Sequence, residues 1–249
     1  MKKALILLSA FVFINSISFG QIKSGEVVYK VKTELDIEKF LDSTSVEVTK
    51  KVKPYVTKIL SNLINSASYL SFRLRFTNNE ARFKGKHYME VDNGLDLNRA
   101  NQQMGGESLY YVNIRDNLRL RQKKSFDKDY LVKRKISRLK WKITNDLKTI
   151  KGYKCRKATT KVDGKNINKI TAWFSPQLPF QFGPKGYAGL PGLILELKQM
   201  HWFYYASKIK LKKKSITIEK PSKGKLISRE DFLKELEKRK KKRRREYAN

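Results

Sequence analysis

Cysteine and histidine are scarce in this chain, which has one cysteine and two histidines among its 249 residues. Because Cys155 has no second thiol to pair with, no intramolecular disulfide can form, and we expect a buried, inert side chain. The chain has no Gly-x-Ser-x-Gly sequence, and a catalytic pair of Cys155 and His201 would lack a third, orienting group. We therefore expect no enzymatic activity. A hydrolytic site assembled only by the fold is the alternative.

Recognisable metal motifs are also missing. His87 stands two residues before Met89, and Met200 directly precedes His201. A thioether beside an imidazole suits Cu(I), but neither pair has the spacing of a known metal motif. The alternative is that the methionines fill gaps in the core while the histidines lie on the surface. We expect no bound cofactor and keep these four residues as weak candidates for a copper site.

Acidic residues are few: 23 Asp and Glu stand against 56 Lys and Arg, for a formal net charge of +33. Without Lys2, Lys3 and the eight cations at 238–245 the charge is still +23, so the excess is spread over the molecule. Such a surface attracts polyanions, namely nucleic acid, lipopolysaccharide, anionic lipid headgroups or acidic glycans, so a polyanion or nucleic-acid binder is an alternative function. A high charge without any specific partner is the alternative. The eight consecutive cations are the candidate contact to an anionic surface: Lys238, Arg239, Lys240, Lys241, Lys242, Arg243, Arg244 and Arg245.

Long apolar runs are absent beyond the N-terminus. Two lysines precede the apolar stretch 4–14, and Ser18-Phe19-Gly20 places small residues where a signal peptidase would cut before Gln21. This pattern predicts a secretory signal peptide at residues 1–20. We expect an exported chain without a transmembrane segment after cleavage, and because of the export we do not expect nucleic acid as its partner. An uncleaved N-terminal anchor is the alternative.

Apolar and polar residues alternate along most of the chain with the period of two that is typical of half-buried strands. Residues 37–67 instead carry apolar side chains at helical spacing, and residues 93–107 are polar enough to form a loop. Short strands joined by tight turns pair antiparallel. We expect strands at 25–32, 69–76, 81–84, 87–91, 108–115, 118–123, 129–135, 138–144, 153–162, 166–175, 193–198, 202–212 and 215–220.

The predicted fold class is mainly β (α+β). We expect one curved antiparallel sheet or open half-barrel, with the 37–67 helix packed on its concave side and a Lys/Arg-rich outer face in water. Residues 21–220 would form a single β-rich domain. Residues 221–249 would be a basic, helical or disordered C-terminal tail, in which a capping box at 228–231 starts a basic helix.

Proline is also scarce, yet four of the six prolines fall within residues 172–197, together with four glycines. Proline fixes φ and glycine permits positive φ, so we expect this apolar segment to form a rigid, bent loop that packs on another apolar surface. It either plugs one end of the curved sheet or lines a groove for an apolar or peptide ligand. The candidate residues are Trp173, Pro176, Pro179, Gly183, Pro184, Gly189, Leu190, Pro191, Gly192, Leu193 and Ile194.

The motifs in this half of the chain occur in a fixed order. Trp141-Lys142-Ile143, Gly152-Tyr153-Lys154-Cys155, Ala172-Trp173-Phe174 and Gly183-Pro184 precede the sequence Gly-Leu-Pro-Gly-Leu-Ile at 189–194. In this order they resemble the GLPGLI family of exported proteins from Gram-negative envelopes. The resemblance implies a mostly β-stranded protein of the periplasm or outer membrane without a known catalytic residue. It also implies an outer-membrane receptor as a partner, because genes of this family often neighbour TonB-dependent receptors. We expect a non-enzymatic binding or accessory module.

Overall fold

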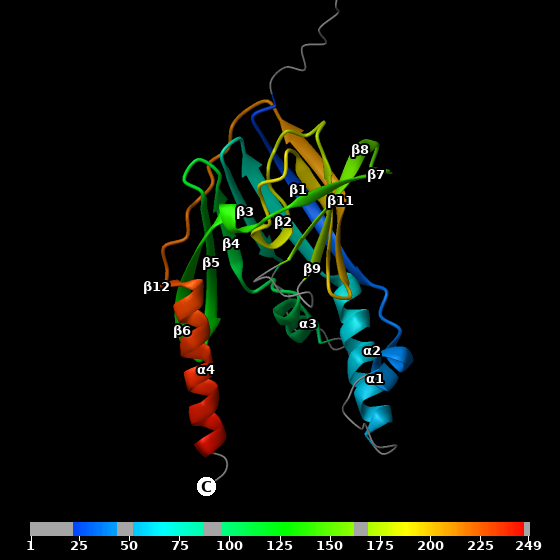
Figure 1. The fold of residues 1–249 in the computed structure, drawn as a ribbon, viewed down its shortest axis with the longest axis vertical. Coiled ribbons are helices and arrows are strands. Elements are labelled where there is room, and N and C mark those ends of the chain that lie inside the picture. The colour runs from blue at the N-terminus through cyan, green and yellow to red at the C-terminus, as the bar shows by residue number, and fades with distance from the viewer. Residues whose placement is uncertain (1–21, 44–51, 87–95, 162–168, 247–249) are drawn as a thin grey trace, which may run out of the picture.

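A computed structural model describes residues 22–43, 52–86, 96–161 and 169–246 (Figure 1). The signal-peptide pattern and the expected strand at 87–91 lie outside these residues. The described strands form one twelve-stranded sheet in the order β12-β6-β5-β4-β3-β2-β1-β11-β10-β9-β8-β7. The two end strands, β12 and β7, do not pair with each other, so the sheet is curved but open, as predicted.

The strands are antiparallel neighbours except for β12, which pairs parallel with β6. In β2 the alternation predicted from the sequence is confirmed: Phe72, Leu74 and Phe76 are at most 1% exposed, while the arginines between them face solvent. The strand bounds are β1 Ser24–Thr33, β2 Ser71–Thr77, β3 Glu80–Gly85, β4 Leu109–Asn113, β5 Leu118–Ser125, β6 Lys128–Lys135, β7 Lys142–Ile150, β8 Tyr153–Lys161, β9 Lys169–Ser175, β10 Leu193–Gln199, β11 Trp202–Lys212 and β12 Lys225–Ser228.

The proline- and glycine-rich segment lies against the inner face of the curved sheet, where its short 3-10 turn Pro184–Gly186 contacts β3, β4 and β5 (Figure 1). Phe180 and Phe182 are at most 1% exposed and pack on the ring of Phe76. Tyr29 donates a hydrogen bond to the carbonyl oxygen of Ile194 at 2.5 Å. The largest apolar core of the described residues is therefore built between this segment and the sheet.

The helices gather at one end of the sheet (Figure 1). They are α1 Ile37–Ser43, α2 Lys53–Tyr69, α3 Leu97–Gln103 and α4 Arg229–Glu246. The expected helix packs less deeply than predicted: only Ser66 and Ala67 of α2 are buried, Leu63 touches the core, and Tyr55 is 68% exposed. The inner face is thus filled by the proline- and glycine-rich segment, which supplies bulkier side chains there than α2 does. None of the described helices is both long and apolar enough to span a membrane.

Three predicted elements differ in the structure. Residues 93–107 were expected to be a loop, but Leu97–Gln103 forms α3, whose N-cap Asp96 accepts a hydrogen bond from the backbone of Arg99. A strand expected at 138–144 begins only at Lys142, after a 3-10 turn at Ile136–Arg138, and runs to Ile150. The strand expected at 215–220 is absent.

The alternation at 215–220 has another origin. Ile218 is buried and Ile216 packs beside it, against Leu109, Tyr111 and Leu120 of β4 and β5. These side chains point away from the main core, since Tyr110 and Val112, their neighbours along β4, belong to that core. The segment therefore covers the outer face of β4 to β6 without pairing, and this part of the outer face is not exposed to water as the sequence had predicted.

Candidate functional site

The candidate residues of the proline- and glycine-rich segment are divided between core and surface. Gly183, Pro184, Leu190, Gly192, Leu193 and Ile194 are buried, Trp173 is half-buried, and Pro176, Pro179, Gly189 and Pro191 are exposed. A Cβ added at Gly192 would lie 2.2 Å from the carbonyl oxygen of Ser175, and Gly189 has a φ of 89°. Both positions therefore require glycine. The burial of the apolar members is what the packing alternative predicts, while a ligand groove at this segment stays a prediction.

The structure describes three of the five residues considered for catalysis or metal binding. Cys155 is fully buried in β8, and burial raises the pKa of its thiol to about 11. His201 is exposed and packs its ring on Phe40, and Met200 is 58% exposed. His87 and Met89 lie outside the described residues. Within the described ranges, no group of three His, Cys, Asp or Glu side chains is placed to hold a metal ion.

A site that the sequence did not predict lies between β4, β5, β6, the turn at Pro184–Gly186 and the first residue of α4. It is a cavity of about 210 Å³. A cavity needs only about 10–15 Å³ to admit one water molecule, so this volume accommodates a group of several heavy atoms. Among the described residues that line it there is no Asp or Glu, and there are five cations: Arg119, Arg121, Arg134, Lys185 and Arg229. We refer to it as the cationic cavity.

Three of these cations have neutral partners. Arg119 donates to the backbone oxygen of Lys185 at 3.3 Å, and Arg121 donates to the hydroxyl of Ser108 at 3.0 Å. The ammonium of Lys185 donates to the amide oxygen of Gln199 at 2.8 Å. Partly buried charges are normally held by opposite charges, because desolvating them costs several kcal/mol each. These three charges are therefore available to an anion from outside the chain.

The pKa values of two cations in the cavity also indicate a site that favours an anion. Burial lowers the pKa of the Lys185 ammonium to about 8, and the nearby Arg121 lowers it further. Burial also lowers the pKa of the Arg119 guanidinium, to about 10. Both groups remain protonated at neutral pH. The clustered cations give the cavity a positive potential. A bound anion would offset the repulsion between Lys185 and Arg121 and the desolvation of Lys185 and Arg119.

A tyrosine hydroxyl completes the cavity. Tyr110 on β4 is 6% exposed and lines the cavity, and its hydroxyl has no hydrogen-bond partner in the described part of the chain. Its ring is held by an edge-on contact with Phe83 and by the guanidinium of Arg121, 5.2 Å from the ring centroid. A buried hydroxyl without a partner costs about 1–3 kcal/mol. A bound anion would accept this hydrogen bond.

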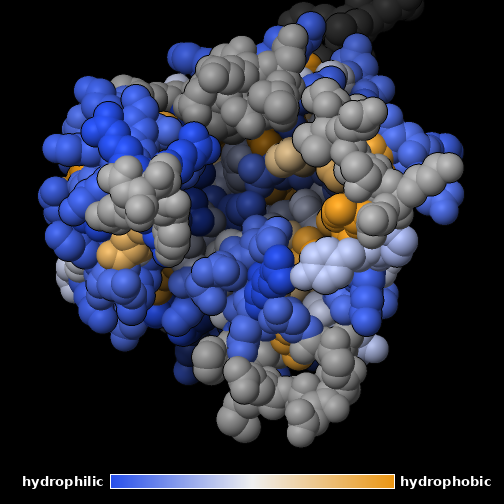
Figure 2. Space-filling model, turned by 90° about the horizontal axis from the view of Figure 1, so that it is seen from below, coloured by the Kyte–Doolittle hydropathy of each residue, from blue (hydrophilic) through white to orange (hydrophobic). Residues whose placement is uncertain are grey.

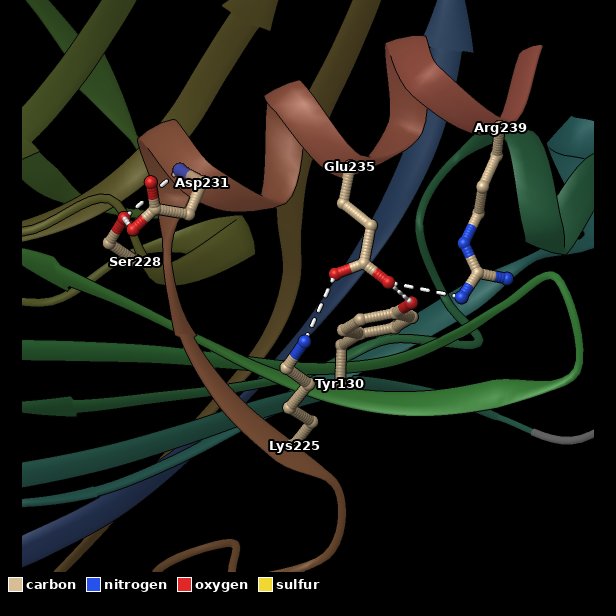
Figure 3. A network of polar contacts seen from close by, with 6 residues as sticks. All are labelled: Tyr130, Lys225, Ser228, Asp231, Glu235 and Arg239. Atoms are coloured by element: carbon tan, nitrogen blue, oxygen red, sulfur yellow. Dashed lines mark hydrogen bonds and ion pairs between the residues drawn. The ribbon is translucent and has the colours of Figure 1, made fainter. Parts of the chain in front are cut away.

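One wall of the cavity is placed by the docking of α4 on β6 (Figure 3). Glu235 accepts a hydrogen bond from the hydroxyl of Tyr130 at 2.6 Å and pairs with Arg239 at 3.0 Å and Lys225 at 3.3 Å. Phe232 packs edge-on against the ring of Tyr130. Hydrogen bonds from these three partners lower the pKa of Glu235 to about 2. This network holds the start of α4, and therefore Arg229, beside the cavity.

The eight consecutive cations of the tail belong to this docked helix. Residues 238–245 all lie within α4, whose helical turns distribute them over several faces. Only Arg239 among them is half-buried, and the other seven are exposed. Acidic residues occupy the first turn of α4 and arginines its last turn, the arrangement that the helix dipole favours. The C-terminal segment thus joins the sheet through β12 and packs on it through α4.

Comparison with known proteins gives a partial family match. A family model described as a protein of unknown function (Porph_ging) matches residues 160–196, which run from the end of β8 into β10 and contain the motif at 189–194. No curated protein matches the chain. The matched part covers the proline- and glycine-rich segment, including Lys185 of the cationic cavity.

Solved structures show similarity in fold. PNGF-II in its P21 crystal form has a TM-score of 0.52 at 12% identity, covering 85% of this chain and 32% of that one. The C2 form of PNGF-II gives a TM-score of 0.49 at 13% identity, with coverages of 83% and 31%. An uncharacterised conserved protein from Thermus thermophilus gives 0.30 at 8% identity, with coverages of 70% and 99%. The chain spans about a third of the PNGF-II chain, and the likeness concerns the fold alone.

Proposed function

We propose that this protein is a non-enzymatic binding module that takes up an anionic group in the cationic cavity. One observation carries the proposal: three cations with neutral partners and the buried hydroxyl of Tyr110 converge on one cavity. Within the part of the chain that the structure describes, this hydroxyl has no hydrogen-bond partner and no carboxylate lines the cavity. Burying these cations without anionic partners destabilises the ligand-free protein, and charge-assisted hydrogen bonds to a bound anion would compensate this cost.

In this proposal the chain is exported by the signal peptide of residues 1–20 and acts in the periplasm or at the outer membrane. The signal-peptide pattern and the resemblance to the GLPGLI family support this location. The proposed partners are an outer-membrane receptor or another envelope protein, and an anionic lipid or glycan surface that meets residues 238–245. Cell fractionation followed by affinity purification from envelope membranes tests both; recovery of the protein in the cytosol alone contradicts the location.

Thermal unfolding with inorganic phosphate tests the cavity. A ligand at 100 times its dissociation constant stabilises the folded state by about 2.7 kcal/mol. For a domain of this size, 1 kcal/mol shifts Tm by about 2–4 °C, so we expect a rise of about 5–10 °C. The Arg121→Gln variant should lose most of this rise. Arg156→Gln is the matched control, because it removes the same charge from an exposed position on β8, outside the cavity.

The result is decisive in either direction. A Tm that does not respond to phosphate, sulfate or a carboxylate such as citrate would refute the proposal. An equal response in Arg121→Gln and in Arg156→Gln would also refute it, because the effect would then come from net charge and not from the cavity.

A further inference from the structure

The cationic cavity has a neighbouring hollow beside α4. This second hollow is open and measures about 780 Å³; Gln102 lines both. Seen from the helical end, the molecule is hollowed beside α4 and the lining visible there is largely hydrophilic (Figure 2). We call this second hollow the α4 groove. Its charged lining comprises the cations Lys123, Lys124, Arg239, Lys242 and Arg243 and the carboxylates Glu107 and Asp127.

Strand β5 connects the two hollows with a row of cations. Arg119, Arg121 and Lys123 occupy alternate positions, so they share one face of the strand. Arg119 and Arg121 line the cavity, and Lys123 lines the α4 groove. The ammonium nitrogen of Lys123 lies 5.5 Å from the centroid of the Phe232 ring on α4. At a rise of about 3.4 Å per residue, successive cations on this face are about 7 Å apart. The row therefore presents evenly spaced charges from the cavity to α4.

Helix α4 forms the opposite side of the groove. Arg239, Lys242 and Arg243 are spaced i, i+3 and i+4, which places them on one face of the helix, and all three line the groove. Lys241 and Arg244 fall on the other side of α4 and do not line it. The run of eight cations in the sequence is thus divided by the helix into a face toward the groove and a face away from it.

The lining also indicates the chemistry of a ligand. Nucleic-acid strands are held by stacking of bases on aromatic rings. Here three rings near the hollows are each covered by a guanidinium of the same chain: Tyr187 by Arg119, Tyr110 by Arg121 and Phe126 by Arg239. These ring faces are occupied, so stacking of bases is disfavoured.

Hydrogen-bonding groups are present instead. The amides of Gln102 and Gln103 line the cavity and can both donate to and accept from hydroxyl groups. Cations together with amides match a ligand that carries both anionic groups and hydroxyls. An acidic glycan has this composition, whereas a lipid surface would offer its charges in a plane and could not follow the row into the cavity.

We propose that the cationic cavity and the α4 groove form one site for an acidic glycan chain. The terminal anionic group lies in the cavity, and the following groups lie along β5 and the groove face of α4. This inference rests on the proposed function, because it takes the cavity as the place where the chain begins. It adds the groove residues Lys123, Arg239, Lys242 and Arg243 to the site, together with a class of ligand.

Fluorescence anisotropy with a labelled heparin hexasaccharide tests the inference, with the mature full-length chain at 0.15 M salt. We compare the double variant Lys242→Gln/Arg243→Gln with Lys241→Gln/Arg244→Gln. Both remove two exposed cations from the same helix, so their net charge is equal. Exposed charge pairs contribute about 0.2–1 kcal/mol each, and the groove variant should lose about fivefold in affinity. The control variant should stay within about twofold of the wild type.

Inorganic phosphate separates this inference from the proposed function. If phosphate binds the cavity and both double variants retain it, but hexasaccharide affinity falls equally in the two, the groove is not a site and only the inference fails. If phosphate, sulfate and citrate all fail to bind, the proposed function itself fails. Tighter binding of a single-stranded DNA 12-mer, or of vesicles containing an anionic phospholipid, than of the hexasaccharide would overturn the class of ligand.

Discussion

The substitution Tyr110→Phe separates the cost of the cavity from its function. It removes one oxygen, while the ring contacts with Phe83 and Arg121 remain. The hydroxyl is buried and finds no hydrogen-bond partner among the described residues. Its removal should therefore leave the free energy of unfolding of the ligand-free protein unchanged or raise it by about 1 kcal/mol. The corresponding change in Tm is about 2–4 °C upward at most.

The same substitution should weaken anion binding. A hydrogen bond to a charged group contributes about 1.5–3 kcal/mol, so we expect phosphate affinity to fall by about tenfold or more. Isothermal titration calorimetry measures the affinity, and thermal or urea unfolding of the same samples measures the stability. If the Tyr110→Phe variant is at least as stable as the wild type but binds phosphate more weakly, the Tyr110 hydroxyl contributes to ligand binding and not to folding.

The neighbouring tyrosine is the matched control. Tyr111 follows Tyr110 on β4 and points to the opposite face, where its hydroxyl donates a hydrogen bond to Glu80. Tyr111→Phe should therefore lower stability and leave phosphate affinity unchanged. If Tyr110→Phe behaves in the same way, its hydroxyl has a structural role and the argument for the cavity is wrong.

Five further outcomes are expected. Since burial lowers the pKa of Lys185 to about 8, sulfate affinity should fall as pH rises through 8, and Lys185→Met should abolish this dependence in calorimetric titrations. The same shift means that the unfolded chain binds a proton that the native one has lost, so unliganded stability should rise between about pH 8 and 10.5 in the wild type relative to Lys185→Met. Cys155 should react with a disulfide reagent only on unfolding, because it is buried and its pKa is raised to about 11; fast labelling of the native protein would contradict its placement. Gly192→Ala should cost about 1–3 kcal/mol in urea unfolding, since its Cβ would meet the carbonyl of Ser175. Glu235→Gln should raise amide hydrogen exchange throughout α4, and unchanged exchange would refute the role given to its three contacts.

Much of the sheet could be predicted from the sequence because the alternation of apolar and polar residues identifies a strand within a few consecutive residues. In β2 and β1 the period of two coincides with burial: Leu74 and Phe76 are at most 1% exposed, as are Tyr29 and Val31. In these two strands the buried face follows from the alternation of neighbouring residues, and a tight turn determines the pairing of consecutive strands such as β2 and β3. Elements that depend on distant partners were missed. Strand β12 pairs parallel with a strand about 95 residues earlier in the chain, and nothing within its four residues indicates this.

The cationic cavity could not be predicted for the same reason. Its cations come from β5, β6, the turn at Pro184–Gly186 and the start of α4, and the sequence holds 56 lysines and arginines among which these five do not stand out. The alternation of apolar and charged residues in β5 is evident in the sequence, but the Lys/Arg-rich face of the sheet was predicted to face water. The structure reverses this assignment, because Leu120 is covered on the outer face by Ile218. Arg119 and Arg121 are thereby turned toward the interior, opposite Val112 and Tyr110 of β4.

The position of α4 changes what its cations can do. A tail that only attracted an anionic surface would gain nothing from being docked, since attraction of this kind depends on charge and not on orientation. Here Phe232 and Glu235 attach the helix to Tyr130 of β6, and this attachment directs Arg239 toward the groove. Because Arg229 lines the cavity at the other end of the same helix, a ligand that spans both hollows would hold α4 at two points. Ligand binding should then stabilise the docked helix, and the order of α4 would report occupancy of the site.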